Sequence, residues 1–167
     1  MLYFIIIGHL FSFAFSSNYH LLPKESKWEE SNFGTQIATQ YREDKTSKEV
    51  VSIEYTGKNR DDVFRFKGGV LATSEGSVMF SFGTSKEIFL TKNFFISTHF
   101  LPSFSIVNNG DKQNSTNGIK FNIAMESGYM ISPNTAISLE WRHLSSNYTT
   151  MPNVAIDSIG IKIRHSF

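Results

Sequence analysis

The chain has 167 residues, which fits a single domain, and no cysteine, which excludes a disulfide framework and a thiolate metal site. Its 16 basic and 15 acidic residues give a formal charge of +1, and this balance argues against a nucleic-acid binder. Phenylalanine is abundant, with 16 copies, and aromatic residues are enriched in β-strands.

The first residues are typical of a targeting segment. Residues 1–15 are almost wholly apolar, and the run is too short to span a bilayer as a helix, which takes about 20 residues. Ala14 and Ser16 form the small-x-small pattern of a signal-peptide cleavage site, although no Lys or Arg precedes the apolar run. We therefore expect residues 1–16 to be a signal peptide and residues 17–167 to form one domain. A buried strand or a retained anchor is the alternative interpretation.

A polar stretch without a clear period follows, from Tyr19 to Asn32. Beyond it, short segments of period-2 alternation are separated by turn-like residues, and none of them has a helical stripe. These segments predict eight strands, at about Phe33–Tyr41, Glu49–Tyr55, Val63–Thr73, Ser77–Leu90, Phe94–Val107, Gly118–Ile131, Thr135–Ser145 and Val154–Phe167.

The alternation gives each of the later strands one apolar and one polar face. In the last strand, Ile159, Ile161 and Ile163 share one face, and Lys162 and Arg164 share the other. Two architectures fit this pattern. A soluble exported β-sandwich would bury the apolar face, whereas a transmembrane barrel would turn it toward lipid and keep the polar face in the lumen.

Three observations favour an all-β, eight-stranded antiparallel transmembrane β-barrel. They are the export signal, the terminal Phe167, and the length of the last strands, about 11–14 residues, because about 9–11 tilted residues cross a bilayer. The lumen of such a small barrel is filled by side chains. We expect charged residues to pair there, namely Lys120, Glu126, Glu140, Arg142, Lys162 and Arg164.

Three polar residues, His143, Ser145 and Asp157, interrupt the outward face near the C-terminus. With both ends of the barrel in the periplasm, Phe167 lies at the inner rim, and Asp157 lies about 25 Å higher, at the outer edge of the membrane. A serine hydroxyl needs a base to become a nucleophile, and a carboxylate orients a histidine for that task. The set predicts an esterase site that faces membrane lipid. Ordinary polar residues at a membrane interface are the alternative.

The C-terminal segment, residues 136–167, resembles the end of the PagL-type lipid A 3-O-deacylases. In that family a strand ends in His-x-Ser, a loop with Pro-Asn follows, and the acid opens the last strand. His143-Leu144-Ser145 and Met151-Pro152-Asn153 match these elements, and Asp157 lies twelve residues after the serine. The resemblance implies Ser145 as the nucleophile, His143 as the base and Asp157 as the orienting acid.

The resemblance also implies residues around the reacting atoms. Asn153 would lie near the oxyanion, and Phe121 would lie beside the site on the lipid-facing side. Two positions depart from the family pattern. The acid is more familiar as Glu where this chain has Asp157, and Ser146 stands where the family usually has Asn, with Asn147 one residue further on.

The expected function is therefore a lipid A 3-O-deacylase of the bacterial outer membrane. Its partner would be lipid A or lipopolysaccharide in the outer leaflet, it would need no cofactor, and a homodimer is left open. A non-catalytic small barrel and an esterase for phospholipid are the alternatives. His20 and His99 have no ligand-spaced partners in the sequence, so no metal site is predicted.

Overall fold

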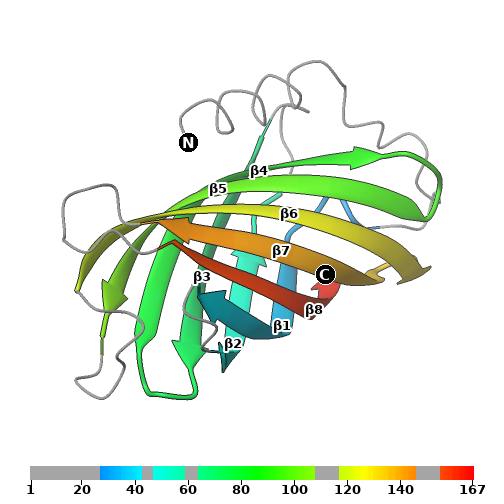
Figure 1. Ribbon diagram of the computed structural model, residues 1–167. Coiled ribbons are helices and arrows are strands. Elements are labelled where there is room, and N and C mark those ends of the chain that lie inside the picture. The colour runs from blue at the N-terminus through cyan, green and yellow to red at the C-terminus, as the bar shows by residue number, and fades with distance from the viewer. Residues whose placement is uncertain (1–26, 43–46, 59–63, 108–116, 146–154) are drawn as a thin grey trace.

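The computed structural model describes residues 27–42, 47–58, 64–107, 117–145 and 155–167. Within these ranges the chain forms eight strands, which wrap around a common interior (Figure 1). The strands are β1 (Asn32–Arg42), β2 (Ser47–Thr56), β3 (Arg65–Thr73), β4 (Val78–Phe89), β5 (Phe94–Ile106), β6 (Gly118–Ser132), β7 (Thr135–Ser145) and β8 (Ile156–Ser166). Among these residues, no helix is long and apolar enough to cross a bilayer.

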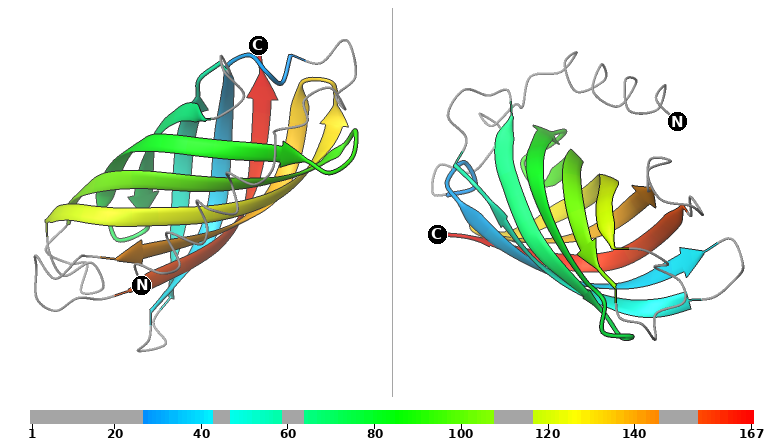
Figure 2. Two further views of the ribbon diagram at one scale, coloured as in Figure 1. Left: turned by 90° about the horizontal axis from the view of Figure 1, so that it is seen from above. Right: turned by 90° about the vertical axis from the view of Figure 1, so that its left-hand side faces the viewer.

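The sheet closes into a barrel because each strand pairs antiparallel with the next and β8 returns to β1. The closing ladder runs from Asn32 beside Ser166, at what we call the terminal end, to Arg42 beside Ile156, at what we call the far end. Figure 2 shows the strands tilted around the barrel from two further sides. Closure leaves no strand edge exposed, which a sheet in lipid requires.

The predicted strands are confirmed, and their observed ends differ from the predicted ones by no more than two residues. β7 begins at Thr135 and ends at Ser145, as the sequence predicts. Two predicted starting points, Val63 and Val154, lie outside the described residues. The alternation that separates strands from turns in this sequence is therefore a reliable guide to its ladder.

The direction of the two faces is also as predicted for a barrel. In β8, Ile159, Ile161 and Ile163 are 47%, 59% and 51% exposed, whereas Lys162 and Arg164 are buried. A soluble sandwich would bury its apolar face and hydrate its charges, so this arrangement excludes the sandwich alternative. The fold is an all-β, eight-stranded antiparallel barrel of the transmembrane kind.

A network of buried ions fills the middle of the lumen. Glu54 of β2 accepts a hydrogen bond from Arg142 of β7, and its carboxylate lies 2.5 Å from the ammonium of Lys162 and 3.0 Å from that of Lys67. The residues predicted to lie inside are all buried: Lys120, Glu126, Glu140, Arg142, Lys162 and Arg164. Of these, only Lys120 lacks an ion pair with another described residue.

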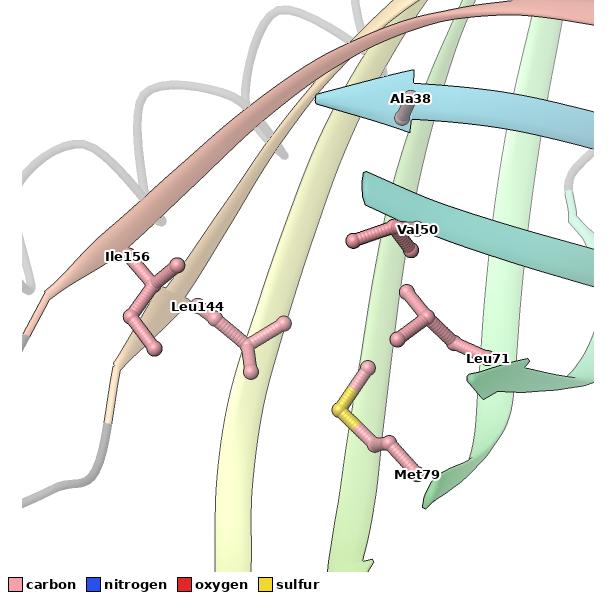
Figure 3. Close-up of a cluster of buried hydrophobic side chains, with 6 residues drawn as sticks. All are labelled: Ala38, Val50, Leu71, Met79, Leu144 and Ile156. Atoms are coloured by element: carbon pink, nitrogen blue, oxygen red, sulfur yellow. The ribbon is translucent and has the colours of Figure 1, made fainter. Parts of the chain in front are cut away.

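Apolar layers lie on both sides of this network. At the far end, six side chains from six strands point into the barrel, and Figure 3 shows them facing one another: Ala38, Val50, Leu71, Met79, Leu144 and Ile156. At the terminal end, a second cluster consists of Trp28, Phe89, Phe95, Met130 and Ala136. The ions are therefore enclosed by apolar side chains above and below, which keeps their mutual attraction strong.

Trp28 is a feature that the sequence pattern does not anticipate, because it lies before β1 in a stretch without periodicity. The side chain is fully buried, and its indole nitrogen donates a hydrogen bond to Glu87. The guanidinium carbon of Arg164 lies 4.5 Å from the centroid of its ring, and Arg65 donates a 2.9 Å hydrogen bond to its backbone oxygen. The segment before β1 is thus anchored inside the barrel by one large aromatic residue.

We expect Trp28→Ala to lower the free energy of unfolding by about 3–5 kcal/mol, because it leaves a cavity and removes the hydrogen bond to Glu87. Urea unfolding in lipid vesicles, followed by the gel mobility of folded and unfolded protein, measures this change. Trp28→Phe, which keeps an aromatic ring, should lose clearly less stability. An alanine variant as stable as the parent would contradict the anchoring role.

Candidate active site

A histidine and a carboxylate meet on the outer wall of the barrel at its far end. His143 of β7 and Asp157 of β8 are direct partners in the ladder, and the His143 Nδ1 lies 2.9 Å from the Asp157 Oδ1. Their side chains are 21% and 49% exposed, in contrast to the enclosed ions of the lumen. This contact follows from the register, because partners in adjacent antiparallel strands have Cβ atoms about 4.5–5.5 Å apart.

Ser145 ends β7, two residues beyond His143, and so has the same outward parity. The serine is nevertheless buried, at 2% exposure, and no hydrogen bond joins it to His143 within the described part of the chain. The structure therefore brings together two of the three predicted catalytic residues as a hydrogen-bonded pair. It leaves the third beside them on the same strand.

Aromatic residues line the wall around this pair. Phe121 of β6 is the ladder partner of Ser145, which is the neighbourhood predicted for it, and its ring stacks on Phe100 of β5 at 6.5 Å between centroids. Trp141 stacks on His143, with ring centroids 6.0 Å apart and planes 30° from parallel. The sequence analysis does not single out Trp141 or Phe100, although both have the outward parity of their strands. Whether Trp141 and Phe100 lie near the site depends on the strand register and on the side-chain rotamers. The outward parity of a residue alone predicts neither.

The remaining predicted residues of the site are Asn147 and Asn153. Both lie outside the described residues, as does Ser146, so the expected oxyanion contacts stay predictions. Tyr41 of β1, which the sequence analysis also omits, is the ladder partner of Asp157 on its other side. A row of outward side chains from β1, β8, β7 and β6 therefore passes through the site: Tyr41, Asp157, His143 and Ile123.

His99 has carboxylate neighbours in the fold that its sequence spacing does not reveal. Its Nε2 lies 3.1 Å from a carboxylate oxygen of Glu126 in β6 and 3.8 Å from one of Glu140 in β7. Both residues are distant from His99 in the sequence, so the sequence alone could not indicate these contacts. The ligand-type atoms of these three residues lie within 4.8 Å of one another, which is close enough to hold a metal ion. The carboxylates, however, already face ammonium groups: Lys162 is bonded to Glu140 and lies 3.6 Å from Glu126. A divalent cation at this position would be repelled by the ammonium group of Lys162.

Fold and site together define a membrane-spanning β-barrel with a hydrogen-bonded His–Asp pair on its lipid-facing wall. No protein-family model matches the chain, and no curated protein matches it. Solved structures do. The outer membrane enzyme PagL aligns with a TM-score of 0.60 and 13% sequence identity, covering 80% of this chain and 99% of its own.

Two further solved structures have the same architecture. Neisserial surface protein A aligns with a TM-score of 0.54 and 16% identity, covering 82% of this chain and 96% of its own. A de novo designed transmembrane β-barrel aligns with a TM-score of 0.58 and 12% identity, covering 81% and 95%. At such identities the likeness concerns the fold alone. One of the three is an enzyme, one a surface protein and one a design, so the fold does not select a function.

We expect zinc and EDTA to leave the urea midpoint of unfolding unchanged, because Lys162 pairs with both Glu126 and Glu140, the carboxylates around His99, and Lys67 pairs with Glu126. If zinc bound only the folded barrel, a free zinc concentration of 100 times the Kd would raise the free energy of unfolding by about 2.7 kcal/mol. Urea unfolding with and without zinc detects a change of this size. A zinc-dependent rise in the midpoint would contradict this reading of the cluster.

Proposed function

We propose that the protein is an outer-membrane lipid A 3-O-deacylase, a serine esterase in which Ser145 is the nucleophile, His143 the base and Asp157 the orienting acid. The observation that carries the proposal is the 2.9 Å hydrogen bond between His143 and Asp157 on the outward face. A polar pair is costly where a barrel wall faces lipid, so a chemical role gives a reason for its presence. The proposal includes export by the signal peptide, residues 1–16.

The chemistry follows the usual logic of a serine esterase. With Nδ1 held by Asp157, the His143 Nε2 takes the proton from the Ser145 hydroxyl as its oxygen attacks the ester carbonyl. Collapse of the tetrahedral intermediate leaves the acyl group on the serine, and His143 returns the proton to the sugar oxygen. Water, deprotonated by the same histidine, then releases a free hydroxy fatty acid and restores the serine. Asn153 and Asn147 are the proposed oxyanion donors.

The choice of substrate rests on position and on resemblance. Residues on a lipid-facing wall near the rim meet ester bonds of membrane lipids rather than soluble esters. The C-terminal segment resembles the PagL-type family in its His-x-Ser element and its Pro-Asn loop, and the outer membrane enzyme PagL has a similar fold. Lipid A in the outer leaflet is the substrate that this resemblance implies.

A non-catalytic barrel is the main rival, because Neisserial surface protein A has the same fold and Ser145 is 2% exposed with no bond to His143 among the described residues. Esterase activity toward phospholipid is the second rival. Acyl release from purified lipid A and from phospholipid vesicles separates the three functions, since each predicts a different pair of results.

We expect cells with the intact chain to carry lipid A that lacks one ester-linked hydroxyacyl chain at the 3-position, and Ser145→Ala to abolish this loss. Mass spectrometry of extracted lipid A measures it directly. The matched control is Ser127→Ala, since Ser127 is an exposed serine on the same outward face of β6, away from the pair. Identical lipid A from intact and Ser145→Ala cells would reject the proposal.

We expect Asp157→Asn to lower kcat by about 100-fold or more, because the amide holds the His143 ring less well and does not stabilise its charged form. Asp157→Glu should retain much of the activity, since the resembling family uses Glu at this place. Glu49→Gln is the control, because it removes an exposed outward carboxylate from β2. Release of acyl chains from lipid A in detergent micelles gives the rates, and an undiminished Asn variant would contradict the assigned role.

A further inference from the structure

Trp141 is an aromatic residue whose ring stacks on that of His143. It precedes the histidine by two residues on β7, on the same outward face, and its ring stacks on the imidazole with centroids 6.0 Å apart. Its ladder partners are Met125 on β6 and Ile159 on β8, both apolar and outward. The indole therefore separates the histidine from the apolar wall that continues toward the terminal end.

The imidazole consequently has two contacts of different kinds. Asp157 forms a hydrogen bond with Nδ1, and the ring of Trp141 stacks on the imidazole. Because Asp157 is about half exposed, its hydrogen bond alone competes with water and leaves the ring free to tilt. A stacked neighbour restricts that tilt, because the centroid distance of 6.0 Å lies within the range of aromatic pairs that attract each other.

The same contact favours the charged ring. A cation within about 6 Å of an indole centroid is attracted by the ring quadrupole. The groups that face His143 are Ile123 from β6, Asp157 from β8 and, beyond it, Tyr41 from β1. Asp157 is the one charged group among these described neighbours. Trp141 therefore supplies the second interaction that is stronger for the imidazolium than for the neutral ring.

We propose that Trp141 is a positioning residue, which holds the His143 ring at the angle set by Asp157 and stabilises the imidazolium formed when the histidine takes a proton. The inference rests on the proposed esterase function. It goes beyond that function by assigning the catalytic histidine a dependence on an aromatic face. Trp141 acts through His143 and touches no reacting atom.

The contact itself is tested without any activity. An imidazolium quenches indole fluorescence, and the chain has two tryptophans, of which Trp28 is buried at the terminal end. In detergent micelles we expect the emission of the wild-type protein to fall on acidification, and this step to be absent in His143→Gln. Equal steps in the two proteins would overturn the proposal, because Trp141 would then not report the charge on His143.

The consequence for the reaction is tested with Trp141→Leu and Trp141→Phe. Leucine keeps apolar bulk but no ring, and we expect kcat to fall about two- to fivefold with KM little changed, while phenylalanine retains most of kcat. In a His143→Ala background, Trp141→Leu should cost nothing further. Leu139→Ala, the next outward residue of β7, is the matched control and should leave kcat unchanged.

Full kcat in Trp141→Leu, or a loss that is equal in Leu139→Ala, would overturn the positioning role. If the wild-type protein cleaves no lipid ester, the proposed function fails, and the fluorescence comparison alone decides whether Trp141 holds His143. A wild-type step that His143→Gln removes would then still support the stacking. The two failures are therefore distinguishable.

Discussion

The carboxylate of Glu54 is the group on which the interior of this barrel depends. It forms ion pairs with Arg142 of β7, Lys162 of β8 and Lys67 of β3. One side chain therefore links strands on opposite parts of the closed sheet. Charges enclosed by apolar layers are stable only when they are paired, because removing one partner leaves an uncompensated ion. The lumen therefore fixes the register of several strands together.

That fixed register determines what happens on the outside. Side chains alternate with period 2, so strands that place Arg142 and Ser158 in the lumen must place His143 and Asp157 on the outer wall, side by side. A slip of one residue between β7 and β8 would bury the histidine and expose the arginine to lipid. The hydrogen-bonded pair on the wall is in this sense held in place by the ion network inside.

The sequence predicts the strands and the direction of their faces because alternation is a local property of each segment. It also predicts that His143 and Asp157 approach each other, since both have outward parity and lie at a similar height on neighbouring strands. It does not predict Trp28, which has no periodic context, nor the partners of His99, which come from other strands. Glu54 and Arg142 have the inward parity of their strands, but β2 and β7 are not neighbours in the sheet, so their meeting depends on the closure of the barrel.

The contrast between the two polar groups of the protein indicates where chemistry belongs. The carboxylates of the lumen cluster meet ammonium and guanidinium groups, and its members are almost wholly buried, so a substrate has no access to them. The outer pair, by contrast, is partly exposed. It consists of the Asp157 carboxylate and the His143 imidazole, and the ring of Trp141 stacks on the imidazole. A network without access stabilises a fold, whereas an accessible histidine with an orienting acid has a proton to exchange. The outer wall, rather than the interior, is therefore where the proposed esterase chemistry would take place.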